Sequence, residues 1–345
     1  NKNFVFNFLK QIFTWWHRQT LGTFIYTLFV GKFVGSDEFG NKYYSNSKEK
    51  RWVIYRNNVE SSKIPPEWHL WIHSLTKNKP PDNPKKFSHA LKEHCAHRTV
   101  DFIDGTIFSE DELYLTLGEF ADQAPEVSDY TYMGIYYKSI REKKIDYLTT
   151  YDYIWRWDTD WFWCSKHFLV QNPAVRFIIG KKRLRSSTYT KLMKLNHECP
   201  LFNFLSGIFD KRESVIQDVQ IPIDNFTQFL NFFQKEIRIS PIWVCPTRVH
   251  DRNTVYDLYK MDPNKLYVNF GFWDVIKSPH EGYHNRKIEK MVKHLNGKKS
   301  LYSSSYYSDE EFWELYNKSA YDRLKLKYDL LNAFSGLYEK CVSKN

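Results

Sequence analysis

Apolar residues in the first part of the chain recur at helical spacing. Over 4–30 they return every three to four residues, with a break at Gly22. Short alternating runs at 42–44 and 51–55 are typical of strands, and the segment 64–72 begins with two prolines, which suit a first helical turn. The pattern predicts a small module built from helices and short strands.

The stretch at 77–86 is rich in lysine and proline, which predicts a linker. The pattern of apolar and polar positions changes after it. Residues 87–97 have the pattern of a short amphipathic helix. The next two apolar runs, 101–108 and 113–120, predict a β-hairpin. The sequence therefore predicts two domains, an N-terminal module at 1–84 and a larger domain at 87–345.

Strands and helices alternate through the larger domain. Strands are predicted over 215–223, 237–244 and 266–272. Between the first two, Asp224 is expected to cap a helix with apolar residues at i, i+3, i+4 and i+7. A capping box at 308–311 predicts another helix. This order predicts an α+β fold, in which helices cover one face of an antiparallel sheet.

Charge is distributed unevenly along the 345 residues, which carry a formal net charge of +10. Residues 1–86 contain 14 Lys/Arg against 6 Asp/Glu, or +8, whereas the remainder contains 36 against 34, or +2. Such a change indicates separate origins or separate partners for the two parts. A basic face could bind nucleic acid, but no nucleic-acid fold signature accompanies it, so no such partner is expected.

Histidine and cysteine spacings do not predict a metal site. The five cysteines form no CxxC pair, which argues against a zinc knuckle or a disulfide framework and favours a reducing compartment. His69 and His73 lie four apart on a predicted helix but lack a third ligand, and the histidines around Cys95 have the wrong spacing for one helix face.

Tryptophan, glycine and tyrosine positions in the first eighty residues follow a specific order. They are Gly31, Val34, Gly35, Asp37, Gly40, Asn41, Tyr43, Tyr44, Arg51, Trp52, Val53, Tyr55, Pro65, Pro66, Glu67, Trp68, His69, Trp71 and His73. Over about residues 10–80 this order resembles the seventeen-kilodalton accessory subunit family of NADH:ubiquinone oxidoreductase, respiratory complex I.

The resemblance implies a cofactor-free accessory module that contacts complex I subunits through residues 1–84. Four tryptophans are expected to be exposed for such a partner, because so short a module buries little surface alone: Trp15, Trp16, Trp68 and Trp71. No apolar run approaches the ~20 residues of a membrane-spanning helix. The expected location is the cytoplasm or the mitochondrial matrix side, soluble or peripheral to the respiratory membrane.

The larger domain contains several long motifs in a fixed order. They are DFIDGTIF at 101–108, DYIWRWDTDWFWC at 152–164, VIQDVQIP at 215–222, PIWVCP at 241–246, LYVNFG at 266–271 and LYSSSYYSDEEFW at 301–313. Together they resemble the C-terminal portion of FAD-linked oxidoreductases of the delta-24-sterol reductase type, in the vanillyl-alcohol-oxidase superfamily. The resemblance implies hydride transfer between flavin and an alkene or alcohol, with NAD(P)H as a candidate reductant.

The glycine pattern departs from this family. A pyrophosphate is normally cradled by clustered glycines, and the chain has no GxGxxG and no adjacent glycine pair. The sequence therefore predicts weak or no FAD binding by the chain alone. Either a second polypeptide supplies the flavin-binding domain, or the sequence joins two genes that are not naturally one protein.

Several residues of the larger domain are candidates for the site. Asp218 and Tyr306 are the catalytic candidates, and Tyr307 and Asn269 the cofactor-binding ones. Each has a simpler explanation, because an acid on a strand could pair with Arg248, and tyrosines or an asparagine also serve in packing and on exposed sheet faces.

The candidate substrate pocket is aromatic. Its expected residues are Tyr267, Trp155, Trp163 and Arg248, with Trp157 and Trp161 in the same run. Such a cluster could bind a lipid-like substrate, although aromatic runs also form ordinary cores. The leading hypothesis is an incomplete FAD-dependent oxidoreductase that follows a complex I accessory module along the chain. The alternative is a non-enzymatic accessory or assembly protein of complex I.

Overall fold

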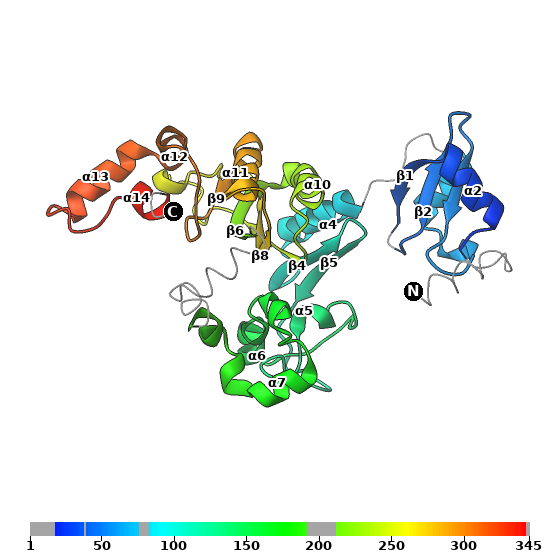
Figure 1. Cartoon of the computed structure of the whole chain (residues 1–345), viewed down its shortest axis with the longest axis horizontal. Helices are drawn as coiled ribbons and strands as arrows, with labels where there is room; N and C mark the ends of the chain where they lie inside the picture. The colour runs from blue at the N-terminus through cyan, green and yellow to red at the C-terminus, as the bar shows by residue number, and fades with distance from the viewer. Residues whose placement is uncertain (1–17, 38, 76–82, 192–211, 343–345) are drawn as a thin grey trace. The chain divides into compact units, whose positions relative to one another are not determined.

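The computed structural model describes residues 18–37, 39–75, 83–191 and 212–342. The chain divides into two compact units, residues 1–90 with 108–113 and residues 91–107 with 114–345. Figure 1 shows both, and each contains its own β-sheet.

The first unit contains a three-stranded antiparallel sheet in the order β1–β2–β3. Its elements are α2 (Leu21–Val30), β1 (Lys32–Ser36), β2 (Lys42–Ser45), β3 (Arg51–Ile54) and α3 (Pro66–Ile72). The side chain of Thr20 caps α2 by accepting a hydrogen bond from the Thr23 amide. The predicted helix over 4–30 is therefore present from Leu21, and residues 4–17 lie outside the described residues.

Two tryptophans form the core of this unit. Trp68 stacks on Tyr43 with ring centroids 3.8 Å apart, and Trp71 meets both rings edge-on. A Cβ on Gly35 would lie 3.0 Å from the Trp68 ring, so the strand passes close to it. Trp68 and Trp71 are at most 3% exposed, and the expectation that they are exposed for a partner is wrong.

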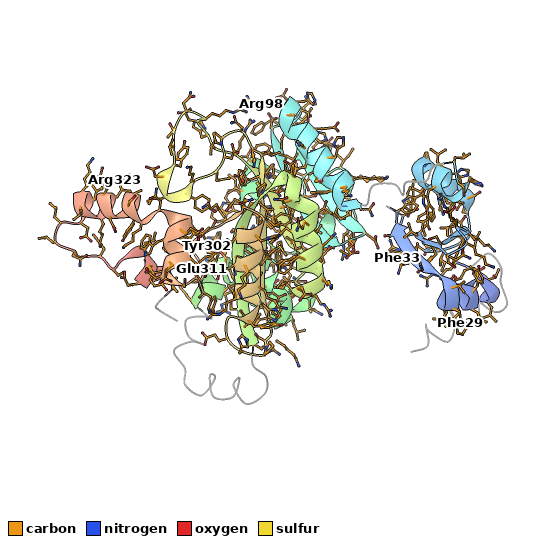
Figure 2. The ribbon with its side chains drawn as sticks, turned by 90° about the horizontal axis from the view of Figure 1, so that it is seen from above. Phe29, Phe33, Arg98, Tyr302, Glu311 and Arg323 are labelled. Carbon is orange, nitrogen blue, oxygen red and sulfur yellow. The ribbon has the colours of Figure 1, made fainter. Side chains whose placement is uncertain are left out.

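The apolar residues exposed on this unit lie elsewhere. They come mainly from α2, which carries no charged residue and buries none of its side chains. Phe29 of α2 and Phe33 of β1 both project from the unit (Figure 2). Trp15 and Trp16 lie outside the described residues.

The second unit contains a six-stranded sheet in the order β5–β4–β7–β8–β6–β9. Its strands are β4 (Phe102–Ser109), β5 (Glu112–Gly118), β6 (Arg212–Pro222), β7 (Ile242–Thr247), β8 (Tyr267–Lys277) and β9 (Lys298–Lys299). Strand β8 lies between β7 and β6 and pairs antiparallel with both. The long central strands therefore fix the register of the sheet.

Helices α4 (Asn83–His97), α10 (Phe226–Glu236) and α11 (Tyr283–His294) lie on one face of this sheet, as Figure 1 shows. Phe229 of α10 packs on Phe270 of β8 at 4.7 Å between ring centroids. The predicted α+β class, with helices covering one face of an antiparallel sheet, is confirmed.

Three local predictions differ from the structure. Asn225, not Asp224, is the N-cap of α10, and Asp224 instead forms an exposed ion pair with Lys92. The strand predicted from 237 begins only at Ile242, because Arg238 adopts a left-handed φ of 64° after the helix ends. Helix α4 starts at Asn83, so the last residues of the predicted linker are helical.

Short helices lie between β5 and β6, within residues 136–184. They are α5 (Tyr136–Ser139), α6 (Thr150–Trp155), α7 (Pro173–Ile179) and the 3-10 turns η2 (Asp158–Asp160), η3 (Cys164–Phe168) and η4 (Lys181–Leu184). Trp161, Cys164, Val170 and Leu184 form their core. The fully buried Arg176 guanidinium donates to the carbonyls of Tyr132, Thr159 and Val170.

The C-terminal segment consists of α12 (Asp309–Tyr316), α13 (Lys318–Tyr328) and α14 (Leu337–Cys341). The predicted capping box is confirmed, since Ser308 and Glu311 bond reciprocally at the start of α12. Before this helix, Lys299 of β9 and Glu289 of α11 form an ion pair at 2.7 Å that is almost completely buried.

Within the described ranges, no helix is long and apolar enough to cross a membrane. The same residues contain no group of three histidine, cysteine or acidic side chains placed to hold a metal ion. Four cysteines belong to this part of the chain, and all four are free.

Candidate active site

The face of the large sheet opposite α10 and α11 carries polar side chains. Successive residues of a strand point to opposite faces. Gln217 of β6 donates to Asn285 of α11, so its neighbour Asp218 points away from that helix. Asp218 and Gln220 therefore share the face opposite α11 with Asn269, which pairs with Gln220 in the register of β6 and β8.

These side chains form one connected network. The Asn269 amide donates to the Asp218 carboxylate at 2.8 Å, and the Gln220 amide donates to the Asn269 oxygen at 2.5 Å. The Tyr259 hydroxyl donates in turn to Gln220. Each amide is thus held by a neighbour on both sides, which fixes the orientation of the Asp218 carboxylate.

Tyr302 joins the network through its hydroxyl, which lies beside the Asp218 carboxylate. The loop after β9 follows the sheet edge, where the Ser300 amide donates to the Asp218 carbonyl at 2.9 Å. Partial burial of the hydroxyl and the neighbouring Asp218 carboxylate raise the pKa of Tyr302, which keeps its proton at neutral pH. The residue is 55% exposed (Figure 2), so an external molecule has access to it.

An aromatic wall borders the network. A Cβ on Gly271 would lie 2.6 Å from Asp218 Oδ1, 2.7 Å from the Trp273 ring and 3.2 Å from the Trp243 ring. Glycine is therefore needed where these three side chains meet. Trp163 extends the wall, with its ring centroid 5.3 Å from that of Trp273. The site thus combines a hydrogen-bonding network with packed tryptophan rings, of which Trp243 and Trp273 are half-buried and Trp163 is completely buried.

A buried ion pair fixes one side of this wall. Trp243 Nε1 donates to the Asp104 carboxylate at 3.3 Å, and Asp104 pairs with Arg156 at 3.0 Å. Both charged side chains are buried. Because Asp104 is held by Arg156, it can orient the Trp243 ring.

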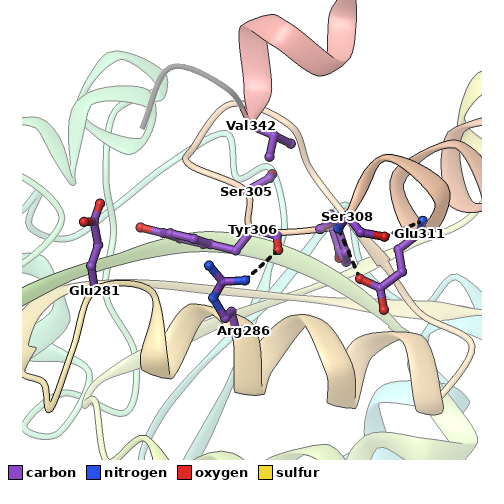
Figure 3. A pocket seen from close by; sticks show the side chains of 8 residues that line it. Glu281, Arg286, Ser305, Tyr306, Ser308, Glu311 and Val342 are labelled. Atoms are coloured by element: carbon purple, nitrogen blue, oxygen red, sulfur yellow. Dashed lines mark hydrogen bonds between the residues drawn. The ribbon is translucent and has the colours of Figure 1, made fainter.

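The structure does not bring Tyr306 or Tyr307 to Asp218. Tyr306 lies over α11, where its amide donates to Glu289 and its ring contacts the Arg286 guanidinium at 5.2 Å. Figure 3 shows Tyr306 and Arg286 in a surface pocket lined also by Ser308 and Glu311. Tyr307 is buried against Phe312 and Tyr316. Tyr306 therefore lies on the side of the sheet covered by α11, whereas Tyr307 packs in a cluster that also includes Tyr259.

The predicted pocket residues have different surroundings. Tyr267 is buried, and its hydroxyl accepts from the Asp262 amide at 3.0 Å. Arg248 is exposed beyond the end of β7, and among the described residues no ion pair joins it to Asp218. Trp155 is 46% exposed on α6, whereas Trp163 is completely buried and contacts the aromatic wall.

Sequence reasoning missed three members of the network: Gln220, Tyr259 and Tyr302. Gln220 lies two residues after Asp218, so strand alternation alone places it on the same face. Tyr302 lies in the same motif as Tyr306, and only the path of the loop past β9 distinguishes them. Nothing in the sequence pattern indicates Tyr259.

The described residues do not fit the pyrophosphate of FAD. Their glycines with left-handed φ, at positions 40, 180 and 282, stand singly. Gly282 precedes α11, and a helix N-terminus is a common phosphate site. At α11, however, the buried Glu213 carboxylate accepts from the amides of His284 and Asn285 at 2.9 and 3.0 Å. The chain's own acid occupies that position.

Comparison with known proteins separates the chain into two regions. Residues 31–106 match the family model of the NADH ubiquinone oxidoreductase subunit NDUFA12. The NADH dehydrogenase [ubiquinone] 1 alpha subcomplex subunit 12 of Mus musculus is 41% identical over 68 residues, which cover 16% of this chain and 47% of the relative. The matched range begins and ends later than the predicted 10–80.

The larger region matches proteins of another kind. The Delta(24)-sterol reductase homolog dhcr-24 of Caenorhabditis elegans is 25% identical over 281 residues, which cover 74% of this chain and 52% of the relative. The Delta(24)-sterol reductase of Homo sapiens is 26% identical over 279 residues, which cover 74% and 50%. The chain thus spans about half the length of these relatives. It joins a segment that matches the NDUFA12 family model to a region that is similar to Delta(24)-sterol reductases.

Proposed function

We propose that residues 87–345 form the substrate-side domain of an FAD-dependent oxidoreductase that acts on a sterol- or lipid-like alkene or alcohol. The observation that carries this proposal is the network of Asp218, Asn269 and Tyr302 beside an apolar aromatic wall. A polar centre beside aromatic side chains suits a substrate with one reacting group on a large hydrocarbon body.

In this proposal Tyr302 is the proton donor. Its hydroxyl retains its proton at neutral pH, and the Tyr302 side chain as a whole is 55% exposed. Asp218 positions that hydroxyl, and Asn269 with Gln220 positions Asp218. Reduction of an alkene requires a proton and a hydride. The described residues offer the proton and the apolar wall, and the flavin is supplied by a separate binding domain.

A reconstitution experiment tests whether this chain supplies the proton donor while a separate domain supplies the flavin. The full chain is co-expressed with the flavin-binding N-terminal half of the human Delta(24)-sterol reductase, and reduction of a Δ24-sterol with NADPH is followed by mass spectrometry. We expect no stoichiometric FAD in the chain purified alone, and turnover only in the combined sample. Tyr302→Phe should lower turnover by about 100-fold or more, because it removes the proposed acid.

The matched control is Tyr328→Phe, which removes a hydroxyl from a highly exposed tyrosine away from the network. It should leave turnover within about twofold, as is usual for surface changes. Stoichiometric FAD in the chain alone, absence of turnover in the combined sample, or equal activity of Tyr302→Phe and the control would each refute the proposal.

The alternative function is that of a non-enzymatic accessory protein of respiratory complex I. The match of residues 31–106 to the NDUFA12 family favours it, together with the exposed apolar side chains of α2. The tagged chain should then co-migrate with complex I on native gels of mitochondria. Phe29→Ser should weaken this association several-fold, since an exposed aromatic side chain is a typical interface anchor.

Leu331→Ser is the control for this test, because Leu331 is also highly exposed but belongs to the second unit. Equal loss with both variants would indicate general destabilisation and would count against a specific contact through α2. Migration of the unmodified chain entirely apart from complex I would exclude the accessory function.

A further inference from the structure

The helical segment after β5 exposes three large apolar side chains close together in the sequence. Leu169, Phe177 and Ile178 are 74%, 72% and 79% exposed. Phe177 and Ile178 lie in the last turn of α7, and Leu169 precedes this helix by four residues. We refer to these three residues as the α7 tip. Large apolar side chains exposed to this degree indicate a binding surface.

A cluster of cations follows the α7 tip directly. Lys181, Lys182, Arg183 and Arg185 are all exposed, and they fall within five residues of one another. Among the ion pairs of the described residues, one reaches this cluster, between Lys181 and Asp129 at 4.0 Å. Its positive charge is therefore largely uncompensated. We refer to these four residues as the basic cluster.

The protein holds both groups on a firm support. The buried Arg176 guanidinium anchors α7 through its bonds to the carbonyls of Tyr132 and Thr159. Beyond α7, Leu184 is completely buried within the basic cluster, and Trp161 Nε1 donates to its carbonyl at 2.7 Å. Because the buried residues Arg176 and Leu184 anchor the segment, the α7 tip and the basic cluster belong to one firmly held turn.

We infer that this turn binds the surface of a bilayer containing anionic lipids. Exposed aliphatic and aromatic side chains enter the boundary between headgroups and acyl chains, while adjacent lysines and arginines attract anionic headgroups. A nucleic acid or an acidic protein would account for the basic cluster. Neither of these partners would account for the exposed apolar side chains of Phe177 and Ile178. The inference concerns the surface alone and does not depend on the proposed redox chemistry.

Vesicle co-sedimentation of the full chain tests the inference. The probes are vesicles of phosphatidylcholine alone and of phosphatidylcholine mixed with phosphatidylserine. We expect stronger partition onto the mixed vesicles, with a decrease as salt is raised. Replacing the four cations of the basic cluster by glutamate should weaken this partition by about tenfold or more. The double variant Phe177→Ser with Ile178→Ser should weaken it comparably, without changing the net charge.

The matched control reverses four exposed cations that do not form a cluster: Arg252, Lys260, Lys265 and Lys290. It changes the net charge equally and should retain most of the binding. Equal loss in this control would show that overall charge alone is responsible and would overturn the inference. So would unchanged binding by the double serine variant, which would indicate a purely electrostatic polyanion surface, or absence of vesicle binding.

Discussion

Replacing Lys299 by methionine is expected to lower the free energy of unfolding by about 3–5 kcal/mol. The Lys299 ammonium is completely buried and contacts the Glu289 carboxylate at 2.7 Å, and it also donates to Ser304 and Ser305. Methionine fills a similar volume but leaves Glu289 as a buried carboxylate without its cation. Urea denaturation monitored by tryptophan fluorescence measures the difference.

Lys293→Met is the control for this prediction. Lys293 pairs with Glu314 at a similarly short 2.6 Å, but the two side chains are 38% and 65% exposed. Solvent screens such a pair, and we expect a loss of at most about 1 kcal/mol. Similar losses for the two variants would show that burial does not determine the strength of the Lys299–Glu289 pair.

The second large effect is expected at Arg176. Arg176→Met should destabilise the helical segment at 136–184 by about 3 kcal/mol, because it leaves the buried carbonyls of Tyr132, Thr159 and Val170 with fewer donors. The loss should be local to the helical segment that contains α7. Hydrogen exchange of amides in 136–184, compared with those of β6 and β8, would measure it.

Arg183→Met provides the comparison, since Arg183 is exposed seven residues further along the chain. We expect it to change stability by about 0.5 kcal/mol or less. Faster exchange throughout the large sheet in Arg176→Met would contradict a local role for this arginine. It would instead make Arg176 a support of the whole unit.

The fold of the second unit could be predicted to a large extent, because its signals are local. The alternation over 266–272 and the apolar stripe of α10 determine which faces meet, and Phe270 indeed packs on Phe229. The capping box likewise fixes the start of α12 through contacts between residues three apart. Asp224 was misplaced because a carboxylate near a helix start has several possible partners, here Lys92.

The site could be predicted only in part. Asp218 and Asn269 share a face by strand periodicity, but their direct hydrogen bond depends on the register between β6 and β8. Tyr302 reaches this network because of the course of a loop, which no periodic pattern encodes. The burial of Trp68 and Trp71 is similar in kind, since tryptophan composition alone does not distinguish a core from an interface.

The short loop between β9 and α12 is tied down at both of its ends. Ser300 is bound to the Asp218 backbone, while Ser304 and Ser305 are bound to the Lys299 ammonium in the interior. Tyr302 stands between these anchors and therefore has little conformational entropy left to lose. A ligand that binds at its hydroxyl would therefore meet a preorganised contact. The entropy of ordering this loop is lost during folding and not during binding.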